Sequence, residues 1–198
     1  MKMPPLTPRT GGGLCIGTEA LQPADIIVST AHGAISGVIR AVTASPISHA
    51  MLYVGNGNVI EAVGEGVLSR SLPAALHGAD LAVAYRYKNL PATAAASVVA
   101  AARAIASQRP KYDLTGALGA GARSNVVLCV VVFRLACPAV ASGAMNDPNK
   151  FFCSELVLEA YRRAGFPITN TPPSSASPDR IVEAYSDGKL IYVGHIIG

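Results

Sequence analysis

The sequence has no tryptophan and little charge: Asp, Glu, Lys and Arg make up 14% of its 198 residues, whereas 51% are hydrophobic. This balance is typical of a globular domain and excludes an intrinsically disordered chain. The 16 basic residues are spread along the chain, and only Arg162 and Arg163 are adjacent. Because no basic stripe with interleaved aromatic residues is present, we expect no nucleic-acid partner. The net charge of +4 still permits attraction to an anionic partner or surface.

Cysteine and histidine are also scarce. The chain has four of each and no CxxC pair, which excludes a disulfide scaffold and argues against a zinc site. We therefore predict no metal and no other cofactor. The N-terminal stretch MKMPPLTPRTGGG has no apolar run after Lys2, so it predicts neither a secretory signal nor a transmembrane segment. We expect a cytoplasmic protein in the producing cell, or one that a specialised secretion system exports to the periplasm without a cleavable signal.

Long hydrophobic runs are missing too. The most apolar stretch, 125–141, is unbroken only from Val126 to Phe133, whereas a membrane helix needs about 20 apolar residues. We predict a buried helix or strand there and no transmembrane span. This stretch belongs to an apolar insertion, 114–148, whose role the sequence leaves open. Residues 1–13, rich in Pro and Gly, predict a flexible N-terminal arm, and 14–198 predict a single domain.

The remaining patterns mix helices and strands. Apolar spacing and turn residues predict helices at 34–43, 92–107, 152–164 and 178–185, with Ser177 as N-cap and Pro178 as the first helical residue. Strands are predicted at 26–29, 79–87 and in the final KLIYVGHII, and a hairpin is predicted from 48–54 and 59–63 around a Gly-Asn-Gly-Asn turn. Because strands and helices do not alternate regularly, we predict an α+β fold with a mostly antiparallel sheet.

The stretch FFCSELVLEAYRRAG (151–165) places Cys153 at the start of a predicted helix. One interpretation is a small buried residue packed beside Phe152 and Leu156, as is common for free cysteines. The other is a nucleophile, because the N–H groups and positive dipole end of a helix favour a thiolate and can hold an oxyanion. The second interpretation requires a histidine that shuttles protons.

His49, on the first strand of the hairpin, is a candidate for that histidine. Glu61 follows on the return strand, and a carboxylate bonded to an imidazole fixes its tautomer and stabilises its protonated form. An acid flanked by apolar residues also requires a partner, because burying it alone is costly. The three residues Cys153, His49 and Glu61 therefore form a candidate catalytic triad.

The hairpin register tests this triad. A two-residue turn at 56–57 places Glu61 opposite Leu52, on the other face of the sheet from His49. A three-residue turn at 55–57 pairs Glu61 with Met51, on the same face as His49. The triad therefore predicts an odd-length turn or a β-bulge.

The segments SHAMLYVGNGNVIEAVGEGV and FFCSELVLEAYRRAG resemble the histidine and cysteine segments of NlpC-type cysteine peptidases. Since His49 and Glu61 precede Cys153, the chain resembles the circularly permuted, YiiX-like branch. The pieces PADIIV, KYDLTGALG and SASPDRIVEA are similar to further segments of that branch. The resemblance implies a papain-like core in which the cysteine helix packs against an antiparallel sheet that carries the histidine and the third residue. It covers about half of the chain and leaves 114–148 without a counterpart.

The resemblance also implies a cysteine hydrolase, and we expect an endopeptidase or amidase that acts on peptidoglycan stem peptides. Such an enzyme could serve as a secreted antibacterial effector, with an immunity or delivery protein as partner. One alternative is an acyltransferase or a lipid or thioester hydrolase, with 125–141 as its apolar site. A catalytically inactive binding module is a third reading. Tyr112, Asp113 and Ser48 are candidate substrate-binding residues, although a turn-capping role for Asp113 and a capping or cross-strand role for Ser48 stay open.

Overall fold

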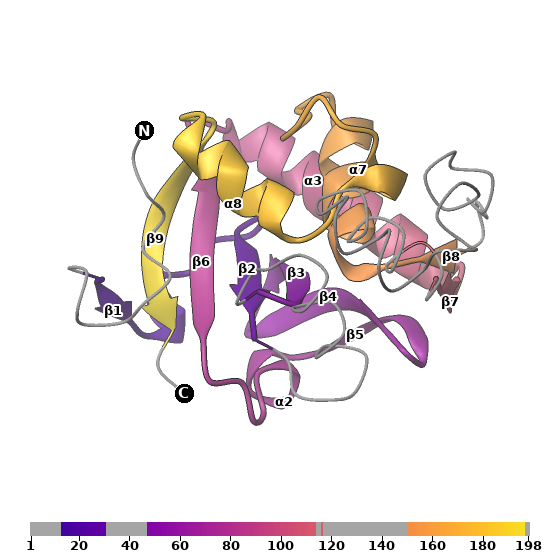
Figure 1. Ribbon diagram of the computed structural model, residues 1–198, viewed down its shortest axis with the longest axis horizontal. Coiled ribbons are helices and arrows are strands. Elements are labelled where there is room, and N and C mark those ends of the chain that lie inside the picture. The colour runs from indigo at the N-terminus through magenta and orange to yellow at the C-terminus, as the bar shows by residue number, and fades with distance from the viewer. Residues whose placement is uncertain (1–12, 31–46, 114–115, 117–149, 197–198) are drawn as a thin grey trace, which may run out of the picture.

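The computed structural model describes residues 13–30, 47–113, 116 and 150–196 (Figure 1). Residues 1–12 of the predicted arm, the predicted helix 34–43 and the apolar stretch 125–141 lie outside the described residues. Of the predicted insertion 114–148, only Gly116 is described.

The centre of the fold is a seven-stranded sheet with the strand order β1-β9-β6-β2-β3-β4-β5. Five neighbouring pairs are antiparallel, and only β1 and β9 at one edge are parallel. The α+β class and the mostly antiparallel sheet are therefore confirmed. The strands are β1 (Cys15–Ile16), β2 (Ile26–Ser29), β3 (His49–Gly55), β4 (Asn58–Val63), β5 (Gly66–Ser71), β6 (Ala82–Tyr87) and β9 (Leu190–Ile196).

A layer of helices covers one face of this sheet (Figure 1). The helices of the described residues are α2 (Leu72–Ala75), α3 (Ala92–Ser107), α7 (Cys153–Arg163) and α8 (Asp179–Ser186), with short 3-10 turns at η1 (Thr18–Ala20) and η2 (Pro173–Ser175). On the helical face, Leu52 and Ile60 of the sheet share one buried cluster with Val98 of α3, Leu156 of α7 and Ile181 of α8. Alternate strand residues build a second cluster on the opposite face, which includes Met51 and Tyr53.

The helix α3 illustrates how local sequence and packing agree. Its Ala-rich segment is a strong helix former, and it begins directly after Pro91. The residues that it buries, among them Ala94, Val98, Ala102 and Ile105, recur at intervals of three or four and so form one stripe. The predicted bounds 92–107 are confirmed.

Several short elements were not predicted from the sequence. The strand β5 extends the hairpin into a three-stranded meander, and β1 adds a parallel edge strand. A separate parallel pair, β7 (Lys111–Tyr112) and β8 (Lys150–Phe151), brings the chain to the start of α7. The helix α8 begins and ends one residue later than predicted, at Asp179 and Ser186, and its N-cap is Pro178, so the prediction of Ser177 as N-cap is wrong.

A buried ion pair ties the start of β2 to β6. Asp25 is fully buried, and its two carboxylate oxygens accept hydrogen bonds of 2.7 Å from Nε and Nη2 of Arg86. The backbone N–H of Gln22 donates a third bond of 2.7 Å. Bidentate pairs of this kind are directional as well as electrostatic, so Asp25 has a structural role just before β2.

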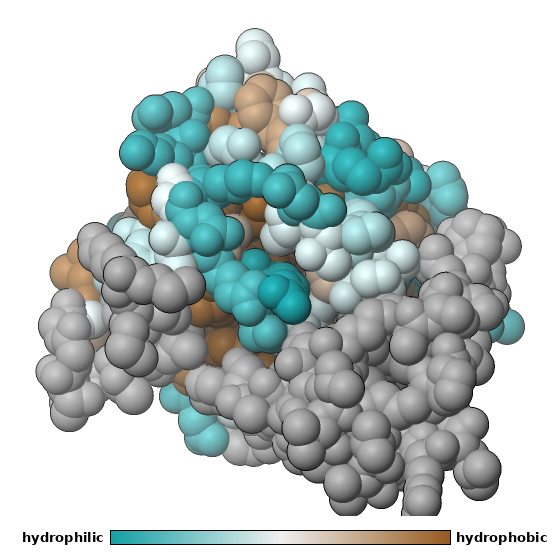
Figure 2. Space-filling view, turned by 45° about the horizontal axis from the view of Figure 1, so that its top comes forward, coloured by the Kyte–Doolittle hydropathy of each residue, from teal (hydrophilic) through white to brown (hydrophobic). Residues whose placement is uncertain are grey.

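The surface over the helical layer is largely polar, with apolar residues showing in small separate areas (Figure 2). Within the described ranges, no helix combines the length and hydrophobicity that spanning a membrane requires.

Candidate active site

The register of the β3–β4 hairpin places Glu61 on the face of His49. Gly55 pairs with Asn58 across a two-residue turn, and a β-bulge lies between Tyr53 and Gly55. The bulge shifts the register so that Met51 pairs with Glu61. The predicted bulge and the predicted Met51–Glu61 pairing are therefore confirmed.

The turn itself explains the Asn-Gly sequence. Asn56 and Gly57 both have positive φ angles, 53° and 70°, which is the conformation of a type I′ turn. The hydroxyl of Tyr53 accepts a hydrogen bond of 3.0 Å from the backbone N–H of Gly57. A side chain of the hairpin thus stabilises the turn, and the turn fixes the register of the two strands.

His49 and Glu61 are joined by a short hydrogen bond. Nε2 of His49 lies 2.6 Å from Oε2 of Glu61, and both side chains are buried. A charge-assisted bond of this length in a buried setting holds the imidazole ring in one orientation. Because Nε2 is engaged by Glu61, Nδ1 is the ring nitrogen left for another partner.

Cys153, the first residue of α7, is a second side-chain partner of His49. Its sulfur lies 4.0 Å from the carbonyl oxygen of Ser48, the residue before His49, and the residue is 1% exposed. Burial lowers the pKa of His49, but hydrogen bonds and charge interactions with Cys153 and Glu61 outweigh burial and raise this pKa to about 10. The contacts of the imidazole therefore favour its protonated form.

The start of α7 favours negative charge at Cys153. Phe152 is the N-cap, and its backbone N–H donates to Oε2 of Glu155 at 3.4 Å, while the next backbone N–H groups have no partner within the helix. Burial, with the charges of Asp113 and Glu159, raises the pKa of Glu155 to about 8, although the bond from Phe152 opposes this shift. Glu155 is therefore mostly neutral at pH 7, and it leaves the positive end of the helix dipole available to the sulfur.

Arg70 is a site residue that the sequence did not single out. It lies on β5, and its Nε is 2.9 Å from Oε1 of Glu61. In the register of β4 and β5, Leu68 pairs with Glu61, and Arg70 is two residues further along on the same face. The place of Arg70 beside Glu61 follows from the pairing of β5 with β4, which the sequence did not predict.

The three candidate substrate-binding residues lie around Cys153 in different ways. Tyr112 is half-buried on β7, and burial followed by the charges of Cys153 and Asp113 raises its pKa, so its phenol lies within electrostatic range of the sulfur. Oδ1 of Asp113 accepts a bond of 2.8 Å from the backbone N–H of Gly116, which is the turn-capping contact left open above. Ser48 is buried and presents its carbonyl oxygen to the sulfur.

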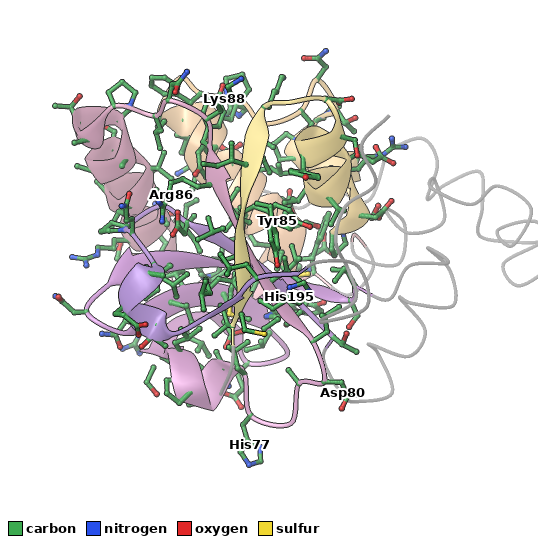
Figure 3. All side chains as sticks on the ribbon, turned by 90° about the vertical axis from the view of Figure 1, so that its left-hand side faces the viewer. His77, Asp80, Tyr85, Arg86, Lys88 and His195 are labelled. Carbon is green, nitrogen blue, oxygen red and sulfur yellow. The ribbon has the colours of Figure 1, made fainter. Side chains whose placement is uncertain are left out.

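The other described cysteine and histidines lie away from this site. Cys15 is exposed on β1 at the far edge of the sheet. His77 points out from the surface, and His195 is buried on β9 (Figure 3). Nδ1 of His195 shares a bond of 2.5 Å with the hydroxyl of Tyr192. These residues therefore do not contribute to the site around Cys153.

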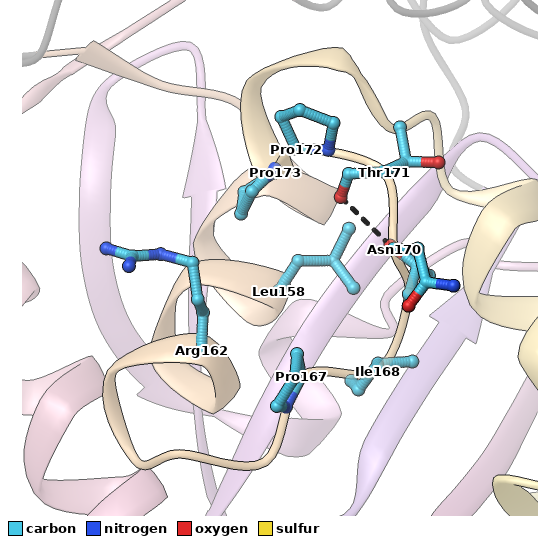
Figure 4. A pocket seen from close by; sticks show the side chains of 9 residues that line it. Leu158, Arg162, Pro167, Ile168, Asn170, Thr171, Pro172 and Pro173 are labelled. Atoms are coloured by element: carbon cyan, nitrogen blue, oxygen red, sulfur yellow. Dashed lines mark hydrogen bonds between the residues drawn. The ribbon is translucent and has the colours of Figure 1, made fainter.

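A cavity of about 400 Å³ lies beside the second half of α7, away from Cys153 at its first residue. Leu158 and Arg162 form its helical wall, and the loop 167–173 forms the other (Figure 4). A bond of 3.1 Å from the hydroxyl of Thr169 to the carbonyl oxygen of Thr171 holds this loop. The cavity contains none of the triad residues.

Comparisons with known proteins agree with the fold and with the expected class. No protein-family model matches the chain. The chain is 28% identical over 194 residues to the probable lipoprotein peptidase YaeF of Escherichia coli K12, a match that covers 89% of this chain and 71% of YaeF. Its fold is similar to that of YiiX from Escherichia coli O157:H7, described as a metalloprotein, with a TM-score of 0.58, 17% identity, and coverage of 86% of this chain and 95% of YiiX. The mixed α+β fold is thus that of YiiX, and the relative in sequence is named a peptidase.

The description of YiiX raises the question of a metal. Among the residues that the structure describes, no group of three or more His, Cys, Asp or Glu side chains is arranged to hold a metal ion. The described donors thus do not fit a metal centre.

Proposed function

We propose that this protein is a cysteine hydrolase that cleaves an amide or peptide bond through Cys153, His49 and Glu61. The observation that carries the proposal is the buried chain of contacts from Cys153 to His49 and from Nε2 of His49 to Glu61 at 2.6 Å. The similarity to YaeF, which is named a peptidase, supports the same reaction class. We interpret the chain order of the three residues as the permuted arrangement of NlpC-type enzymes.

The first half of the reaction follows from the charges of the pair. With His49 protonated, Cys153 is held as a thiolate, and its sulfur attacks the carbonyl carbon of the substrate. The carbon–nitrogen bond breaks as His49 transfers its proton to the leaving nitrogen. The products of this step are a free amine, a neutral His49 and an acyl group bonded to the sulfur of Cys153.

The second half restores the resting state. Water attacks the acyl carbon, and the now neutral His49 accepts a proton from it. The carbon–sulfur bond breaks, which releases the carboxylic acid and regenerates the thiolate beside the protonated His49. Glu61 holds the imidazole ring in one orientation for both proton transfers. N–H groups at the start of α7 are available to bind the oxyanion that forms in each half.

We propose peptidoglycan stem peptides as the substrate, because the motifs around His49 and Cys153 resemble those of enzymes that cut them. The test is incubation of purified protein with peptidoglycan fragments and analysis of the products by mass spectrometry. The matched variants are Cys153→Ala, which removes the nucleophile, and Cys15→Ala, which removes an exposed cysteine away from the site. Products that require Cys153 but not Cys15 support the proposal.

The alternatives give different results in the same experiment. If no fragment is cut but a thioester or acyl donor labels Cys153, the protein is an acyltransferase or a lipid or thioester hydrolase. If neither reaction occurs and Cys153 reacts as an ordinary thiol, the protein is a binding module and the hydrolase proposal is wrong. The effector role is tested separately: export of the protein to the periplasm of Escherichia coli should lyse the cells, and the Cys153→Ala variant should not.

A further inference from the structure

Glu61 has a second cationic partner besides His49. Its Oε2 is bonded to His49, while Nε of Arg70 lies 2.9 Å from Oε1. The carboxylate is almost fully buried, with 2% of its side chain exposed, whereas 32% of the Arg70 side chain is exposed. A buried carboxylate thus lies between a buried imidazole and a guanidinium that reaches the solvent.

Arg70 interacts with Glu61 as an ion pair and not through a hydrogen bond. Oε1 of Glu61 has no hydrogen-bond partner among the described residues. The nearby N–H of Arg70 therefore does not point at this oxygen with hydrogen-bond geometry. An ionised carboxylate with one oxygen lacking a hydrogen bond is expensive to bury unless an opposite charge compensates it. Among the described residues, Arg70 supplies that charge to Oε1.

The other ion pair of Arg70 is weaker. Its Nη2 lies 3.9 Å from Oε2 of Glu65, whose side chain is 80% exposed. Exposed pairs at this distance contribute little, since water screens them. Arg70 therefore interacts more strongly with Glu61 than with Glu65. A substitution of Glu65 is a matched control for the loss of the weaker ion pair.

We propose that Arg70 is a positioning residue of the active site, whose positive charge compensates the buried carboxylate of Glu61 and holds it in place so that Glu61 can orient the protonated His49. The inference rests on the proposed cysteine chemistry and adds to it a residue that acts through Glu61 without touching the substrate. It also gives the second oxygen of a buried carboxylate a cationic partner at 2.9 Å.

Removal of the positive charge of Arg70 has two effects of the same sign. The buried carboxylate of Glu61 keeps only one of its two cationic partners, so it holds the protonated His49 less firmly. The site also loses one positive charge, which disfavours a thiolate at Cys153. Both effects lower the reactivity of Cys153 at acidic pH.

The test uses iodoacetamide alkylation of Cys153 as a function of pH, followed by mass spectrometry of the tryptic peptide 151–162. This measurement does not depend on the identity of the substrate. The variants are Arg70→Met and Arg70→Gln, which remove the charge, Arg70→Lys, which keeps it, and Glu65→Gln as the control. Circular dichroism verifies that each variant is folded. Two neutral variants are used so that the inference can still be tested if one of them does not fold.

We expect the neutral variants to shift the acid midpoint of Cys153 alkylation upward and to lower its rate at pH 5 by about threefold to tenfold. Arg70→Lys should stay within about twofold of the parent protein, and Glu65→Gln should match it. Neutral variants that superimpose on the parent curve, or a lysine variant as impaired as they are, would overturn the inference. If the parent protein itself alkylates like an ordinary thiol, the proposed function fails instead, and the two failures are thereby distinguished.

Discussion

The pairing of Cys153 with His49 predicts an unusual pH dependence of alkylation. The perturbation is His49→Ala, which removes the imidazole and leaves the sulfur and its helix in place. The assay follows carboxamidomethylation of Cys153 from pH 5 to pH 10 by mass spectrometry. Cys15, which is exposed and away from the site, serves as an internal standard in the same samples.

The expected magnitude follows from the two ionisations. An ordinary thiol with a pKa of about 8.5 is ionised to about 0.3% at pH 6. The pKa of His49 is raised to about 10 by its bonds to Cys153 and Glu61 despite its burial. The protonated imidazole favours a thiolate beside it, while the lower basicity of a paired thiolate reduces its nucleophilicity, so we expect a net acceleration at pH 6 on the order of tenfold over a free thiol.

The midpoint is more informative than the rate. Because Cys153 is 1% exposed, its absolute rate of alkylation also reflects access by the reagent. Restricted access of the reagent scales the rate at every pH alike, whereas the midpoint reports ionisation. We expect the midpoint of Cys153 to lie below that of Cys15 in the parent protein and to rise in His49→Ala, because a buried thiolate without its cationic partner is disfavoured. A midpoint near that of Cys15 in the parent protein would refute the thiolate–imidazolium pair.

Three further predictions concern the acids of the fold. Glu61→Gln should lower kcat/KM by about a hundredfold or more, because a neutral amide stabilises the protonated His49 less; an unchanged value would contradict its role in the triad. Asp25→Asn should reduce the free energy of unfolding by about 3 kcal/mol in urea titrations, since it leaves Arg86 without its buried partner; a loss below about 0.5 kcal/mol would show that water compensates the guanidinium. Because burial raises the pKa of Glu155 to about 8, its contribution to stability is fully present below about pH 4.5 and is lost as the pH rises to about 8. The Glu155→Gln variant should lack this loss, which is at most about 1.4 kcal/mol per pH unit; parallel stability curves for variant and parent would refute the shift.

The helices and strands that the sequence predicted well are those that are specified by residues close together in the chain. The helix 92–107 combines high helix propensity with one apolar stripe, and the hairpin combines β-rich runs with an Asn-Gly turn. The elements that it missed are short and depend on their partners. The strands β1, β7 and β8 have two residues each, so they exist only because a neighbouring strand pairs with them.

For the candidate site, the local sequence specifies a cysteine at a helix start, and a histidine and a glutamate on one hairpin. It also limits their geometry to two hairpin registers. The bulge between Tyr53 and Gly55 selects one of these registers, and the packing of α7 brings Cys153 to His49 across about a hundred residues of chain. Arg70 became visible for the same reason. Contacts between distant segments depend on how strands pair and helices pack, and no local pattern of residues records them.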